Sequence, residues 1–104
     1  MSPAPAADPN PARCAIEARA GGVTLVLSGD WMVARGAPRA ADVVPELRAQ
    51  AARELGFDCD ALGSWDSLLV TLLLGIDEEC TRAGIRLDTR NLPEGALRLM
   101  ALAR

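Results

Sequence analysis

A chain of 104 residues, half of them hydrophobic, is long enough to bury one core and does not have the composition of a disordered protein. Its net charge of −3 argues against nucleic acid as a partner. The absence of histidine excludes Ser-His-Asp and Cys-His catalysis and most zinc sites, and the absence of lysine excludes a lysine-containing phosphate loop. We therefore expect a protein that is not an enzyme and that needs no cofactor and no metal ion.

The three cysteines, Cys14, Cys59 and Cys80, have neither metal-ligand nor redox spacing. An odd number of cysteines in a small chain without a signal peptide favours reduced thiols in a cytoplasm. The uncharged run from Ser67 to Ile76 is about half as long as the roughly 20 residues that a membrane helix needs. The sequence therefore predicts a cytoplasmic domain that does not itself insert into a membrane.

The first 13 residues contain four prolines and no apolar period, which is typical of a flexible lead-in to a domain that covers residues 14–104. Two short strands, Cys14 to Arg19 and Val23 to Ser28, are predicted next, and the two glycines between them suit a tight hairpin turn. The second strand has almost no polar alternation. We therefore expect it to be central and covered on both faces.

Asp42 is the expected N-cap of a helix from Val43 to about Gln50, with Pro45 in its first turn. Apolar residues then alternate with glycine and aspartate from Leu55 to Cys59, which predicts a third strand. A loop is expected to lead from this strand to the central helix of the chain.

The central helix is predicted to begin at Asp66 and Ser67 and to end at Gly84, where a C-cap glycine belongs. Apolar residues recur at helical spacing between these ends. The opposite face is polar, and its Glu78 and Arg82 are four residues apart and able to pair.

The start of this helix leaves two alternatives open. Val70 and Leu74 make the apolar face wider than one packing surface needs, so either the helix is deeply buried or its first two turns also contact a partner. Trp65, directly before the cap, either packs on the helix as a hydrophobic staple or lies exposed as an anchor for a partner.

A fourth strand is predicted from Ile85 to Asp88, and a last helix begins at Pro93. This helix is apolar nearly all round after Arg98 and would expose Leu99, Met100 and Leu102. Either it lies across the domain or the chain is a piece of a longer protein. The predicted fold is α/β, in the order β-β-α-β-α-β-α, with a small mixed four-stranded sheet and about three packed helices.

Three motifs, in this order and spacing, resemble the STAS domain family (sulfate transporter and anti-sigma-factor antagonist). They are LSGDW at 27–31, FDCDALGSWDSLL at 57–69 and GIRLDTRNLPEGALRLMALA at 84–103. The W-D-S and L-P-E-G details are most similar to the STAS domain fused before the permease of Mla-type (MlaE-like) lipid ABC transporters, and to its stand-alone counterpart MlaB. The resemblance covers roughly residues 14–104.

This resemblance implies a non-enzymatic interaction or regulatory module that docks on the ATPase subunit of a lipid ABC transporter. The permease would be a second partner, either as a separate chain or fused after Arg104. The domain would then lie at the inner face of a bacterial inner membrane. The docking surface expected from the motifs consists of Gly63, Ser64, Trp65, Asp66, Ser67, Leu68 and Val70.

The family resemblance also implies an alternative, an anti-sigma-factor antagonist regulated by phosphorylation at Ser67. Family members often carry D-S-[SA]-G at this helix start, whereas Leu68 and Leu69 here replace the small residue and the glycine. As a phosphosite Ser67 would hold a dianion at the positive end of a helix dipole, although Asp66 would repel it.

A rival from another class is an acyl carrier protein with phosphopantetheine on Ser67, because LGSWDSL is close to the carrier motif L-G-x-D-S-L. Carrier proteins are all-helical and strongly acidic, and the predicted strands oppose that interpretation. A cation site at Asp58, Asp60 and Asp66 is not expected, because their spacing matches no calcium loop.

Overall fold

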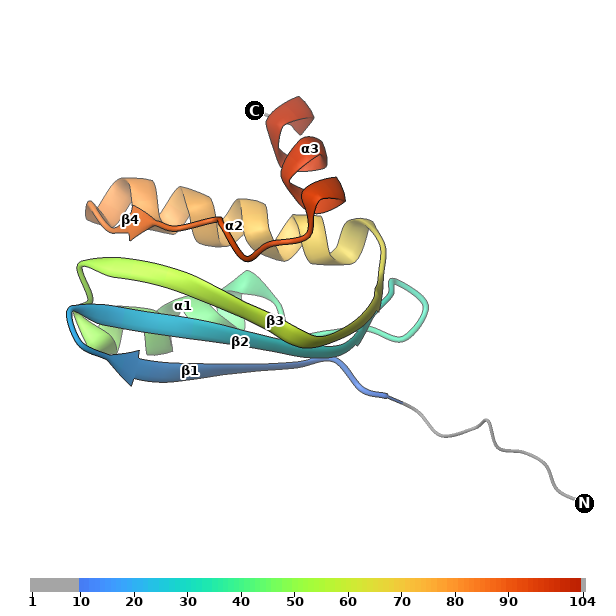
Figure 1. The fold of residues 1–104 in the computed structure, drawn as a ribbon, viewed down its shortest axis with the longest axis horizontal. Coiled ribbons are helices and arrows are strands. Elements are labelled where there is room, and N and C mark those ends of the chain that lie inside the picture. The colour runs from blue at the N-terminus through green and yellow to red at the C-terminus, as the bar shows by residue number, and fades with distance from the viewer. Residues whose placement is uncertain (1–9, 104) are drawn as a thin grey trace, which may run out of the picture.

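The computed structural model describes residues 10–103, which form a four-stranded mixed sheet and three helices (Figure 1). Residues 1–9, most of the predicted lead-in, lie outside the described part. The order β-β-α-β-α-β-α is confirmed. The strands are β1 (Arg13–Arg19), β2 (Gly22–Trp31), β3 (Glu54–Trp65) and β4 (Arg86–Leu87), and the helices are α1 (Ala40–Gln50), α2 (Ser67–Ala83) and α3 (Glu94–Ala103).

The sheet has the order β1-β2-β3-β4, with β1 antiparallel to β2 and the other pairs parallel. The hairpin turn between β1 and β2 has Gly21 at φ +80°, a conformation that glycine adopts without steric cost. Pro11 forms a bridge with Asp30, so the chain joins the sheet before Cys14. The core-facing register sets Leu25 of β2 opposite Phe57 of β3.

Strand β2 is central, as predicted, but the expectation that helices cover both its faces is wrong. Alternate residues from Val23 to Trp31 are buried and the residues between them are half-buried. Helix α1 lies behind the sheet, and no helix of the described part lies in front of β1, β2 and β3 (Figure 1). Both crossovers join neighbouring parallel strands in one direction, and right-handed crossovers then place α1 and α2 on the same face. We call the other face the open face.

Helix α2 begins and ends where the sequence predicts. The side chain of Asp66 caps its N-terminus, and Gly84 at φ +73° ends it in the left-handed conformation. Helix α1 begins earlier than expected, because Arg39 and not Asp42 is its N-cap residue. Asp42 is the third helical residue, and its carboxylate accepts a hydrogen bond from the backbone N–H of Arg39 at 3.0 Å. Pro45 therefore falls in the second turn.

Strand β3 is longer than predicted and includes the segment 60–65 that the sequence suggests is a loop. It continues beside β2 to the pair Trp31 and Trp65, with two irregularities in register on the way. The alternation of apolar residues stops near Cys59 because the later residues are mostly exposed. The backbone pairing that extends the strand cannot be recognised from the pattern of hydrophobic residues.

The predicted pairing of Glu78 with Arg82 is wrong, because Arg82 pairs with Glu79 instead, at 3.0 Å. Glu79 is only 3% exposed, and Arg48 of α1 donates two hydrogen bonds to its carboxylate, at 2.8 and 3.0 Å. A Cβ on Gly75 would lie 2.5 Å from the Cβ of Ala40. Helix α1 therefore packs closely on the side of α2 that the sequence presents as polar.

The wide apolar face of α2 is accounted for within the chain. Val70 is 7% exposed, and Leu74 is half-buried against the core. Helix α2 contacts α1, α3 and β4, so it is enclosed on several sides. Helix α3 buries Ala96 and Met100 against the domain. Leu99 and Leu102 of the same helix are 43% and 81% exposed.

The buried carboxylate of Glu79 gives the fold a dependence on pH. The hydrogen bonds from Arg48 lower the pKa of Glu79 below its ordinary value of 4.5, and the nearby charges of Arg48 and Arg82 add to this effect. Because the folded pKa is depressed, the stabilisation is fully present above about 4.5 and is lost as the pH falls through the folded pKa. Glu79→Gln should lower the free energy of unfolding at neutral pH and flatten its decline in acid.

Urea unfolding at several pH values would measure this difference. Glu78→Gln is the matched control, because Glu78 is its exposed neighbour in the same helix. Equal pH dependence in the two variants would contradict the role given to Glu79.

Candidate functional site

Asp66 ties three segments together at the start of α2. Its backbone N–H donates to the carbonyl oxygen of Trp31 at the end of β2, at 3.0 Å. Its carboxylate accepts from the backbone N–H of Leu68 at 2.9 Å, which caps the helix. The same carboxylate accepts from the N–H of Val33, with its two oxygens at 3.0 and 3.2 Å. The loop after β2 is thereby held against the first turn of α2.

A second aspartate fixes the end of β3. The Oδ1 atom of Asp30 accepts a hydrogen bond from the backbone N–H of Ser64 at 2.9 Å. The N–H of Asp30 donates to the carbonyl oxygen of Asn10 at 2.8 Å. A Cβ on Gly63 would overlap the Asp30 carboxylate, which would then have to move from its hydrogen bond with Ser64. The segment expected to be a free docking loop is therefore a fixed strand end.

The residues of the expected docking surface differ in exposure. Gly63, Ser64 and Ser67 are exposed, and Trp65, Asp66 and Leu68 are half-buried. Val70 is a core residue, so its side chain is not part of the accessible surface. The accessible part of the expected surface is thus the end of β3 and the first two residues of α2.

Trp65 is half-buried, so it is neither fully packed nor fully exposed. Its ring packs partly against the core, and a Cβ on Gly95 would lie 3.2 Å from its Cη2 atom. The absent side chain of Gly95 therefore makes room for the indole at the start of α3. The Trp65 of W-D-S and the Gly95 of L-P-E-G, far apart in sequence, are in contact.

Ser67 is the first residue of α2, and its hydroxyl is exposed. Asp66 performs the capping, so the Ser67 hydroxyl is not needed for it, and this hydroxyl makes no hydrogen bond within residues 10–103. The backbone carbonyl of Ser67 accepts from the hydroxyl of Thr71 at 3.0 Å. The Ser67 hydroxyl is thus presented to solvent at the positive end of a helix dipole.

An apolar groove that sequence reasoning missed lies beside Ser67. It has a volume of about 320 Å³ and runs between the first turns of α1 and α2. We call it the α1–α2 groove, and its lining is Pro38, Arg39, Ala40, Ala41, Leu68, Thr71 and Leu72. The neighbouring Val33 is 62% exposed although its backbone is held by Asp66.

The missed residues belong to the stretch MVARGAPRAA, which follows the LSGDW motif. An apolar Val33 within a segment rich in Arg, Gly and Pro was the available signal. The side chains of Arg35 and Arg39, in this segment, form no salt bridge with an acidic residue of the described part. Arg39 also lines the α1–α2 groove, and exposed apolar surface with an unpaired cation at its rim is typical of a contact surface for another molecule.

The chemistry available elsewhere in the chain is limited. Burial raises the pKa of Cys14 to about 12 and those of Cys59 and Cys80 to about 11, so all three thiols are protonated and weakly nucleophilic at neutral pH. Within residues 10–103 no group of histidine, cysteine or acidic residues is placed to hold a metal ion. No helix in this same range is long and apolar enough to cross a membrane.

Two substitutions test whether Asp66, and not Ser67, caps α2. Ser67→Ala should change the free energy of unfolding by less than about 0.5 kcal/mol, as for most exposed positions. Asp66→Ala removes the cap and the bond to Val33 and should cost about 1–2 kcal/mol. Thermal and urea unfolding of the two variants measures the difference, and an equal or larger loss for Ser67→Ala would show that Ser67 is the cap.

Searches with protein-family models and against curated proteins found no match. Among solved structures, the chain is similar to the Bacillus cell fate determinant SpoIIAA in its phosphorylated form. The two share 16% sequence identity, the similarity covers 88% of this chain and 83% of SpoIIAA, and the TM-score is 0.62. The expected fold is therefore confirmed: the chain is a small α/β domain with a STAS-like fold, and its sheet contradicts the all-helical carrier fold.

Proposed function

We propose that this chain is a non-enzymatic interaction module of an Mla-type lipid ABC transporter and that it docks on the ATPase subunit. The observation that carries the proposal is the contact between Trp65 and Gly95, which joins the W-D-S and L-P-E-G motifs at one end of the domain. Those motifs are the ones most similar to the Mla-type domains. Their contact sets α3 against the end of β3, directly before Ser67.

The docking surface in this proposal is the end of β3, the first turn of α2 and the α1–α2 groove. It includes Gly63, Ser64, Ser67, Leu68 and the exposed part of Trp65. Its apolar groove suits the packing of a partner side chain, while unpaired Arg39 at its edge suits an acidic partner group. A permease, separate or fused after Arg104, would be the second partner, and the module would act at the cytoplasmic face of the inner membrane.

A second candidate is an anti-sigma-factor antagonist that is switched by phosphorylation at Ser67. The exposed hydroxyl at a helix N-terminus supports it, and so does the similarity to SpoIIAA, whose structure is of a phosphorylated form. Two features oppose it: the Asp66 carboxylate lies next to Ser67, and Leu68 contributes apolar surface where the family carries a small residue. We therefore rank contact through this surface above modification of it.

A charge in the α1–α2 groove tests the docking surface. Thr71 is exposed and lines the groove, so Thr71→Glu should place a carboxylate where it repels an acidic partner group and where the partner would desolvate it. We expect co-purification with the cognate ATPase subunit of the proposed transporter to fall by about tenfold or more, which corresponds to about 1.4 kcal/mol. Thr81→Glu is the matched control, because Thr81 is an exposed threonine near the other end of α2.

Circular dichroism of both variants confirms that they fold. A folded Thr71→Glu variant that binds as well as the control would contradict the proposed surface. Intact mass spectrometry after incubation with ATP and a kinase of the anti-sigma type separates the second candidate, since a phosphate mapped to Ser67 would favour it.

A further inference from the structure

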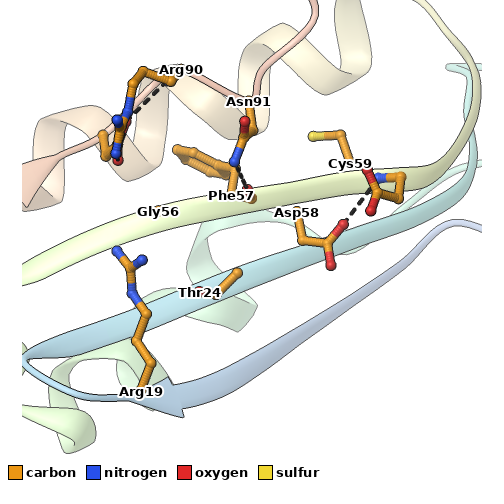
Figure 2. A pocket seen from close by; sticks show the side chains of 10 residues that line it. Arg19, Thr24, Gly56, Phe57, Asp58, Cys59, Arg90 and Asn91 are labelled. Atoms are coloured by element: carbon orange, nitrogen blue, oxygen red, sulfur yellow. Dashed lines mark hydrogen bonds and ion pairs between the residues drawn. The ribbon is translucent and has the colours of Figure 1, made fainter.

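The open face of the sheet carries a cavity that the docking surface does not use. It has a volume of about 560 Å³, a size that fits a small molecule. Strands β1, β2 and β3 form its floor, and the segment after β4 forms one wall (Figure 2). Helix α1 lies behind the sheet, so this cavity opens on the opposite side of the domain from that helix (Figure 1).

One end of the cavity has a weakly held cation. The guanidinium of Arg19 lies over Gly56, where a Cβ would be 2.9 Å from the Nη2 atom of Arg19. Its ion pair with Glu54 is long, 3.6 Å, and the two side chains are 40% and 38% exposed. Such a pair in water contributes little, so Arg19 can exchange Glu54 for the anionic group of a ligand.

The second arginine of the cavity, Arg90, already forms an ion pair with Asp88. Arg90 donates to both carboxylate oxygens of Asp88, with a shortest distance of 2.7 Å. These hydrogen bonds lower the pKa of Asp88 to about 2, which keeps the pair ionised over the whole ordinary pH range. The charges of Arg90 and Asp88 therefore cancel in the wall of the cavity. Arg19 is the arginine that can exchange its partner Glu54 for a ligand.

The other end of the cavity is anionic. Asp58 lies two residues from Gly56 on the same face of β3, roughly 7 Å along the strand. One of its oxygens accepts from the backbone N–H of Asp60 at 3.0 Å. Neither the Asp58 carboxylate nor the Asp60 carboxylate forms a salt bridge with an arginine of residues 10–103. Thr24, paired with Gly56 in register, lines the floor.

We propose that this cavity binds a small zwitterion that has an anionic oxygen group and an ammonium group separated by a short carbon chain. The anionic group replaces Glu54 on Arg19, and the ammonium group lies between Asp58 and Asp60. The two ends attract opposite charges, so a molecule that carries both makes two charge-assisted contacts at once. Both ends are open to water, so an affinity of about millimolar is expected.

O-phosphoethanolamine is the probe, titrated into the isotope-labelled chain while amide NMR shifts are recorded. We expect saturable shifts at Gly56, Asp58 and Asp60. Inorganic phosphate and ethylamine, tested singly, should each bind about tenfold more weakly because each makes one of the two contacts.

Arg19→Gln and Asp58→Asn should each weaken binding of the probe about tenfold. Asn retains the oxygen that accepts from the backbone N–H of Asp60, Arg19 is exposed and Asp58 is only half-buried, so the fold should be preserved. Arg13→Gln is the control, since Arg13 lies on the same face of β1 as Arg19 but at its other end.

The proposal is overturned if the shifts do not saturate at the cavity, if either single ion binds as tightly as the zwitterion, or if both variants bind like the Arg13→Gln control. These readouts require no ATPase, so their failure leaves the proposed docking function untouched, and the converse also holds.

Discussion

The carboxylate of Asp66 is the interaction on which the site depends. It caps α2 and holds Val33, while the backbone N–H of the same residue binds the end of β2. A central strand, a loop and a helix therefore meet at one residue. Since the cap is already provided, Ser67 is exposed and the first turn of α2 is fixed beside that of α1.

The same constraint explains why the proposed docking surface can be rigid although it is built partly from loops. Val33 is exposed, yet its backbone is bonded to Asp66. Gly63 and Ser64 are bonded or packed against Asp30. A surface held in this way loses little conformational entropy when a partner binds, which favours affinity. The cavity on the open face lies apart from these residues, so one occupant need not displace the other.

Features that depend on residues close together in the sequence could be predicted, whereas features that depend on contacts between distant segments could not. The ends of α2 were predictable because Asp66 and Gly84 act on their own turns. The bond from Arg48 to Glu79 was not predictable, because it requires that α1 pack on α2, and a helical wheel shows Glu79 only as one polar residue among several. Val70 was ambiguous for the same reason, since periodicity does not reveal how many elements enclose a helix.

The strands show a similar limit. Apolar Val26 made β2 look covered on both faces, although it lies on the open face and is only half-buried. The end of β3 was interpreted as a loop because backbone pairing, not side-chain alternation, extends it. The α1–α2 groove was missed altogether, because its two walls are about 30 positions apart in the chain and meet only in the fold.

The central claim is that a protein partner contacts the first turn of α2 and the segment that Asp66 holds against it. Amide hydrogen exchange of the chain, alone and in complex with the proposed ATPase partner, tests it most directly because it maps the covered backbone without any substitution. The account predicts slower exchange in residues 33–41 and 63–71 on binding, with no change in the strand residues that face the open-face cavity. Protection confined to the open face, or to the exposed side of α3 around Leu102, would contradict it.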